Sequence, residues 1–146
     1  MIKKLILLML CLCLMSSISM KVFADETNKE QSLEQESIIS PYMDYIARAS
    51  CFLYIDSNGK ATTDCSVYGY QGITTKVTIT ANLQQYKDGR WVTIKTFAES
   101  ANSHRAFLYE TTTISKGYTY RVTAEVKAYS SSNVETRSMT SSEAVY

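Results

Sequence analysis

The chain has 146 residues, 15 lysines and arginines against 14 aspartates and glutamates, a formal net charge of +1 and 45% hydrophobic residues. A chain of this length can form one domain with a substantial hydrophobic core. Acidic and basic side chains are mixed along it, with no basic block that would follow a phosphate backbone, so we expect no nucleic acid partner.

The first 24 residues have the features of a secretory signal peptide. Lys3 and Lys4 precede the apolar run LILLMLCLCLM, and VFA, ending at Ala24, offers the residues that a signal peptidase reads. A membrane anchor is the alternative, but the apolar run is much shorter than the roughly 20 residues that cross a bilayer. We therefore expect residues 1–24 to be removed and the remaining chain to be secreted, without a membrane span.

Residues 25–40, DETNKEQSLEQESIIS, form an acid-rich stretch without aromatic residues. Such a stretch cannot bury enough apolar surface to offset the entropy lost on ordering, so we predict a disordered, flexible tether. Residues 41–146 then form the folded domain. At its start, Ser40 and Pro41 suit the first residues of a short helical turn, and an extended first strand fits the same segment equally well.

Beyond Ala49 the sequence changes to a period of two, in which every second residue is apolar, and this is the pattern of half-buried strands. The alternation is clear in residues 51–56, 77–84 and 120–127. Turn sequences separate these segments: SNG at 57–59, YGYQG at 68–72, KDG at 87–89, ESANS at 99–103, SKG at 115–117 and SSSN at 130–133. Six turns divide the chain into seven strands, which predicts an all-β, two-sheet sandwich; a closed eight-stranded barrel is the alternative.

Two segments in the second half of the chain, KVTITANLQQYKDGRWVTIKTF from residue 76 and RAFLYETTTISKGYTYRVTAEVKAY from residue 105, resemble the middle and end of a fibronectin type III domain. An Asp-Gly hairpin, a tryptophan soon after it, and Ile114 six residues before Tyr120 carry the resemblance. It implies an immunoglobulin-like sandwich in which Tyr120 is a tyrosine corner, with its hydroxyl bonded to backbone a few residues upstream. The chain departs from that family in lacking the early proline-rich stretch and the core tryptophan of the second strand.

The order of features along the whole chain resembles a family of small secreted proteins of unknown function from clostridia-like Gram-positive bacteria. The features are the signal peptide, the acidic tether, ISPYMDYI, a glycine-turn hairpin and a final GYTYRV strand. Membership implies a secreted protein with the same fold. It implies no activity.

Cys51 and Cys65 are the two cysteines beyond the signal peptide. The sequence between them suits a hairpin whose three-residue loop, 57–59, ends with Gly59 in the left-handed region. Counting outward from this loop places Cys51 opposite Cys65 at a non-hydrogen-bonded pair, where the Cα atoms approach to about 4.5 Å. A disulfide tolerates that distance, so we expect one here; two free buried thiols or a metal site are the alternatives.

Candidate catalytic groups are scattered along the chain. The single histidine, His104, lies in SANSHRAF, far from both cysteines, and Glu99 and Glu110 stand alone. DSNG at residues 56–59 resembles the start of a calcium loop but lacks the acidic residues that should follow. No phosphate-binding glycine loop and no Gly-x-Ser-x-Gly motif is present. We expect no enzymatic activity, no metal and no cofactor.

Aromatic residues are abundant, with 11 tyrosines, 4 phenylalanines and 1 tryptophan. If Cys51 and Leu53 point inward, Phe52 and Tyr54 point outward, and the same parity places two further tyrosines on that face. The candidate binding residues are Tyr54, Tyr68, Tyr70, Tyr86 and Trp91. Planar rings on a flat sheet can stack on sugars or contact a protein. Alternatively, the segment PYMDYIA covers this face, or Trp91 only caps the edge of the core.

These observations favour a monomeric, secreted, non-catalytic interaction domain. Its partner would be a protein or glycan of the cell envelope or of a host surface. A carbohydrate-binding sandwich is the first alternative, and a secreted inhibitor or toxin is the second.

Overall fold

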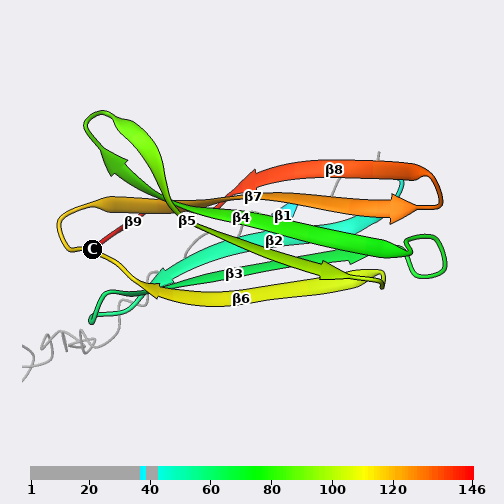
Figure 1. The fold of residues 1–146 in the computed structure, drawn as a ribbon, viewed down its shortest axis with the longest axis horizontal. Helices are drawn as coiled ribbons and strands as arrows, with labels where there is room; N and C mark the ends of the chain where they lie inside the picture. The colour runs from blue at the N-terminus through cyan, green and yellow to red at the C-terminus, as the bar shows by residue number, and fades with distance from the viewer. Residues whose placement is uncertain (1–36, 39–42) are drawn as a thin grey trace, which may run out of the picture. The chain divides into compact units, whose positions relative to one another are not determined.

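The computed structural model describes residues 37–38 and 43–146, and every regular element in these residues is a β-strand (Figure 1). The strands are β1 (Ser37–Ile38), β2 (Ile46–Ile55), β3 (Lys60–Gly69), β4 (Lys76–Lys87), β5 (Arg90–Ala101), β6 (Arg105–Thr113), β7 (Thr119–Ser130), β8 (Asn133–Thr140) and β9 (Ala144–Val145). Strands β2 to β8 have 8 to 12 residues each and are the seven predicted strands.

Two antiparallel sheets pack face to face and confirm the predicted sandwich. The first sheet has the order β1-β2-β3-β6, and the second has the order β5-β4-β7-β8 with β9 beside β7. In Figure 1, β7 and β8 of the second sheet lie along the upper side of the view and β2, β3 and β6 of the first sheet along the lower side, with β4 and β5 drawn across the middle. Over the described residues both sheets end in free edge strands, so the domain is an open sandwich and not a barrel.

The predicted turns connect these strands. In the β2–β3 turn, Gly59 has a φ of 77°, the Gly59 N–H donates to Asp56 O at 3.1 Å, and the Asp56 N–H donates to Lys60 O at 3.1 Å. In the β4–β5 turn, Asp88 and Gly89 both have positive φ values, of 53° and 76°. Two consecutive residues with positive φ form the kind of tight turn whose twist matches that of the two strands in a hairpin.

The start of the domain bears on two of the sequence expectations. β1 lies within the segment expected to be a tether and pairs with Ser50 and Ala49 of β2. β2 begins at Ile46, so the extended alternative applies from that residue onward. Ser40 and Pro41, the signal peptide and the remainder of the tether lie outside the described residues.

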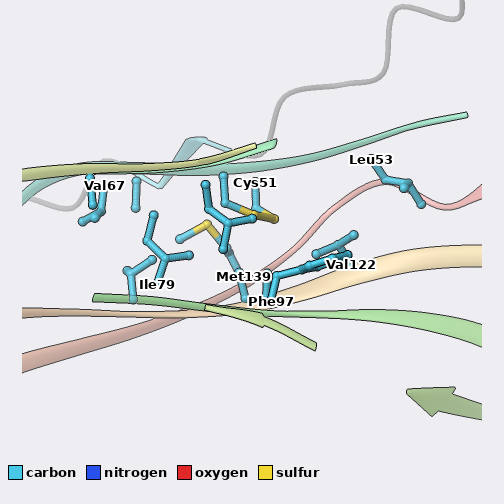
Figure 2. Packing of buried hydrophobic residues seen from close by; sticks show 14 of the residues in the cluster. Cys51, Leu53, Val67, Ile79, Phe97, Val122 and Met139 are labelled. Carbon is cyan, nitrogen blue, oxygen red and sulfur yellow. A yellow bond between two sulfur atoms is a disulfide. The ribbon is translucent and has the colours of Figure 1, made fainter. Parts of the chain in front are cut away.

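The core forms where the alternating side chains of the two sheets meet. Figure 2 shows Cys51, Leu53 and Val67 of the first sheet pointing toward the second. They face a group of side chains from β4, β5, β7 and β8: Ile79, Phe97, Val122 and Met139. All seven are less than 9% exposed, which is the basis of the hydrophobic stabilisation of this domain.

The disulfide between Cys51 and Cys65 is present, in the predicted register, within this core. The two cysteines are paired across β2 and β3, with 4.0 Å between their Cα atoms. Both are nearly inaccessible to solvent. The cysteines therefore join two adjacent strands of one sheet, as predicted by counting residue pairs outward from the 57–59 loop.

Tyr120 is fully buried at the start of β7. Its hydroxyl donates to Ser115 O at 2.6 Å and accepts a hydrogen bond from Gln85 Nε2 at 2.9 Å. This is the geometry of a tyrosine corner. Ile114 is also buried, and its N–H donates to Gly59 O at 2.9 Å, which ties the β6–β7 connection to the β2–β3 turn.

Candidate functional site

A group of large aromatic side chains lies on the outer surface of the first sheet. Phe52 and Tyr54 come from β2, Tyr68 from β3, and Phe107 and Tyr109 from β6. We call these side chains the aromatic face. They alternate with buried residues along their strands, so they point away from the core.

The strand register places a strip of short polar side chains between the rings. Asp64 of β3 is paired with Phe52 of β2 and with Tyr109 of β6, and Ser66 is paired with Phe107. The strip consists of Thr62, Asp64 and Ser66. Neighbouring strands lie about 4.8 Å apart, so the aromatic residues of β2 and β6 flank this strip at a separation of about 10 Å.

One end of the aromatic face is held by contacts between its own side chains. The Arg48 guanidinium lies over the Tyr68 ring, 4.5 Å from its centroid, and the Phe107 ring meets Tyr68 edge-on at 5.4 Å. Toward the other end, the Phe52 and Tyr54 rings lie 5.9 Å apart at an interplanar angle of 25°. These contacts limit the rotamer freedom of the rings and so lower the entropy lost on binding.

Asp64 is the charged group at the centre of the strip. Partial burial beside Phe52 and Tyr109 raises the pKa of its carboxyl above the ordinary value of 3.8. Among the described residues its carboxylate has neither a hydrogen bond nor an ion pair, whereas Ser66 Oγ is bonded to Ser50 Oγ at 2.8 Å. The carboxylate oxygens are therefore available as acceptors.

Three rings of the aromatic face are open to solvent. Tyr109 is 69% exposed, Phe107 54% and Tyr54 46%. The described part of the segment PYMDYIA does not lie across them, because Met43 and Ile46 are buried in the core cluster. Large exposed apolar side chains gathered on one surface are typical of interaction sites.

The predicted binding residues do not form one surface. Tyr54 and Tyr68 belong to the aromatic face, but Tyr70 lies beyond the end of β3, in the loop that leads to β4. Its backbone N–H donates to Tyr45 O at 3.2 Å. Tyr86 and Trp91 are paired with each other on β4 and β5, in the other sheet.

Trp91 makes contacts within the protein that account for its position. Its ring lies 4.1 Å from the Arg121 guanidinium and 5.1 Å from the Tyr86 ring. Arg121 also donates from Nε to Gln84 Oε1 at 2.9 Å. This cluster lies on the outer surface of the second sheet near the projecting end of the β4–β5 hairpin, at the upper left of Figure 1.

Sequence reasoning missed Phe107 and Tyr109. The sequence RAFLYE contains the signal, because Phe107 and Tyr109 alternate with Ala106 and Leu108, which are buried. The alternation predicts that the two rings point outward. It does not predict that β6 lies beside β3, and that pairing is what brings the rings next to Asp64.

The middle of the outer surface of the second sheet differs in composition from the aromatic face, although Tyr86 and Val134 are exposed toward its two ends. Its side chains are mainly hydroxyl-bearing and charged: Thr78, Thr80, Asn82, Thr96, Ser100, Thr123, Glu125, Lys127, Thr136, Ser138 and Thr140. A depression of about 350 Å³ lies there, lined by residues that include Thr80, Ser100 and Lys127. Lys127 Nζ is 2.9 Å from Glu125 Oε1, so its charge is paired within the protein.

The other candidate chemical groups do not come together. His104 is half-buried in the loop between β5 and β6, where its backbone carbonyl accepts a hydrogen bond from the Gly69 N–H at 2.6 Å. Glu99 and Glu110 lie on different strands and are exposed. Within residues 37–38 and 43–146, no cluster of three or more His, Cys, Asp or Glu side chains is suited to hold a metal ion.

Comparisons with protein families, with curated proteins and with solved structures yield no match to this chain. Over the described residues, no helix has the length and apolar character needed to cross a membrane.

Proposed function

We propose that this chain is a secreted, non-catalytic binding domain that contacts its ligand through the aromatic face. The observation that carries the proposal is that Tyr54, Phe107 and Tyr109 are exposed together on the outer surface of the first sheet. The second sheet also exposes Tyr86 and Val134, but these lie at opposite ends of β7, with hydroxyl-bearing and charged side chains between them. Both sheets bury their opposite surfaces in the same core, so folding alone does not require rings on the outside of either.

Secretion is supported by two independent features. The first 24 residues have the charge and apolar pattern of a signal peptide. The Cys51–Cys65 disulfide belongs to a class of bond that persists in oxidising compartments outside the cytosol. Both features fit a protein that meets its ligand in the cell envelope or on a host surface.

An immunoglobulin-like sandwich of the fibronectin type III kind is also part of the proposal. The sheet orders β2-β3-β6 and β5-β4-β7-β8 and the buried hydroxyl of Tyr120 support it. Domains of this architecture serve many unrelated functions, so the fold adds nothing to the choice of ligand. The aromatic face remains the basis of that choice.

The test is co-sedimentation of the mature protein with insoluble material, namely purified Gram-positive cell envelopes and mucin-coated beads. The double variant Phe107→Ser with Tyr109→Ser should lose binding, because it lacks the two most exposed rings of the aromatic face. The matched control is Tyr86→Ser with Val134→Ser, which removes exposed apolar side chains from the second sheet. The proposal would be contradicted if the wild type bound neither the envelopes nor the beads. It would also be contradicted if the two double variants bound equally well.

A further inference from the structure

We propose that the aromatic face binds a neutral, extended polysaccharide of the β-1,4-linked type, lying along β3. This inference rests on the function proposed above and names the ligand class for the same surface. It follows from what lies at the centre of the aromatic face, from the size of that face, and from the charges around it.

The centre of the aromatic face is polar, which is the reverse of a protein interface. In protein interfaces the centre is apolar and depleted of charge, and the polar groups form the rim. Here Asp64 and Ser66 occupy the middle strand. Asp64 has a ring on each side, Phe52 and Tyr109, whereas Ser66 has Phe107 on one side and Ser50 on the other. Such a surface suits a ligand that forms hydrogen bonds along its middle and apolar contacts at its sides.

The dimensions of the aromatic face also fit a narrow ligand. From Arg48 to Tyr54, β2 extends about 20 Å, and the β2 to β6 separation is about 10 Å, so the aromatic face is about twice as long as it is wide. A single extended polymer chain needs much less width than a protein.

Hydrogen-bonding groups of both kinds are available to sugar hydroxyls. The Asp64 carboxylate has no partner among the described residues and can accept strong hydrogen bonds from hydroxyl groups. Arg48 and Arg105 are both paired with Tyr68 and supply donors at one end of the strip. The opposite signs of Asp64 and the two arginines favour a neutral ligand, because a strongly charged polymer would be repelled at one end or the other.

The arrangement of the rings favours a flat, extended chain. The Phe52 and Tyr54 rings are nearly parallel and follow one another along β2, and Phe107 and Tyr109 follow one another along β6. β-1,4-linked pyranose chains form flat ribbons whose C–H faces can stack on such rings, whereas α-1,4-linked chains coil. The face is thus matched to a ribbon that runs parallel to the strands.

The experiment is isothermal titration calorimetry of the mature protein with a panel of hexasaccharides. The panel contains cellohexaose, xylohexaose, mannohexaose and N-acetylchitohexaose, with α-linked maltohexaose as the negative comparison. Tyr109→Ala and Asp64→Asn should each weaken binding by at least about tenfold. The matched controls, Tyr86→Ala on the second sheet and Asp88→Asn in the β4–β5 turn, should leave the affinity unchanged.

The inference is established if at least one β-1,4-linked hexasaccharide binds the wild type and the controls but not Tyr109→Ala or Asp64→Asn. Failure of all four to bind at millimolar concentration, equal binding of maltohexaose, or equal losses in Tyr86→Ala, would overturn it. If the envelope or mucin binding described above still depends on Phe107 and Tyr109, and is abolished by protease treatment of that material but not by periodate oxidation of its sugars, the ligand is a protein. In that case the proposed function stands and the polysaccharide assignment is wrong.

Discussion

Tyr120 is the largest of the fully buried side chains in the described part of the chain, and it carries a hydroxyl into the core. The hydroxyl serves two partners: it donates to Ser115 O and accepts from Gln85 Nε2. The first bond fixes the connection between β6 and β7, and the second reaches across to β4. A single phenolic oxygen therefore links three segments of the sandwich.

We expect Tyr120→Phe to lower the free energy of unfolding by about 1–3 kcal/mol, because it leaves buried partners without a hydrogen bond. Tyr118→Phe is the matched control: it makes the same chemical change two residues earlier, where the ring is half-buried and packs edge-on against Tyr120. It should change stability by no more than about 0.5 kcal/mol. Denaturant unfolding at unchanged m-value measures both, and equal losses would show that the Tyr120 hydroxyl bonds contribute little.

Asp64 should make stability depend on pH with a defined sign. Burial raises the pKa of its carboxyl in the folded protein, so its favourable contribution is fully present below about pH 3.8 and is lost as the pH rises through the raised value. At neutral pH the ionised carboxylate disfavours folding slightly, and Asp64→Asn should raise stability by less than about 0.5 kcal/mol because the side chain is largely solvated. Near pH 3 the difference should vanish. If Asp64→Asn were less stable than the wild type at pH 7, the expected direction of the pH dependence would be wrong.

At the scale of elements, alternation and turn sequences together predict the strands. Residues such as Val77 and Val122 alternate with polar neighbours, and glycine and asparagine mark the points where the chain reverses, so strand positions follow from local sequence. The pairing of β3 with β6 is different, because about 40 residues separate them and no local pattern specifies it. For that reason Tyr54 and Tyr68 could be placed on the outside, but their neighbours Phe107 and Tyr109 could not.

The edge strands carry charged residues on the side that faces the core. Glu110 of β6 is paired with Thr63, a buried residue of β3, so its side chain lies on the inner surface of the first sheet. On β5, Lys95 and Glu99 are paired with Leu83 and Ile79, which are buried. Inward-pointing charges at an edge disfavour pairing with a second molecule, because extending the sheet would bury them.

Glu110→Thr should therefore promote self-association through β6, which is a free edge and carries Phe107 and Tyr109 of the aromatic face. The matched control is Glu125→Thr, which removes the same charge from the outer surface of the central strand β7. We expect a concentration-dependent dimer for Glu110→Thr and a monomer for Glu125→Thr and the wild type in sedimentation velocity experiments. A monomeric Glu110→Thr variant at all concentrations would mean that other features protect this edge.

At the scale of the whole domain, the two sheets are joined at both ends by contacts outside the hydrophobic core. Glu135 of β8 accepts hydrogen bonds at Oε2 from the N–H groups of Tyr45 and Ile46, at 2.7 and 2.9 Å, where β2 begins. Arg137 Nη2 lies 2.8 Å from Glu135 Oε1 as an ion pair without hydrogen-bond geometry. This buried carboxylate connects the edge of the second sheet to the start of the first.

The C-terminal segment closes the opposite end. Ser141 is buried; its N–H donates to Val122 O at 2.9 Å, and its Oγ accepts from the Val122 N–H at 2.9 Å. Tyr146 exchanges backbone hydrogen bonds with Tyr118, and its ring lies against Gly59, where an added Cβ would be only 2.6 Å from the ring. The last residues of the second sheet thus cover the β2–β3 turn of the first.

Deleting residues 141–146 should therefore cost at least about 2 kcal/mol of unfolding free energy, because both backbone groups of Val122 lose their partners in a buried position. Deleting only residues 143–146 keeps Ser141 and removes β9 and the Tyr146 ring, so it should cost less and fray the end near Tyr118. Thermal and denaturant unfolding of the two truncations, with amide hydrogen exchange at Val122, separates these contributions. Equal stability of the shorter truncation and the wild type would mean that the ring on Gly59 adds nothing. If the two truncations were equally stable, the entire loss of unfolding free energy would come from removing β9 and Tyr146. The two hydrogen bonds between Ser141 and Val122 would then contribute nothing to stability.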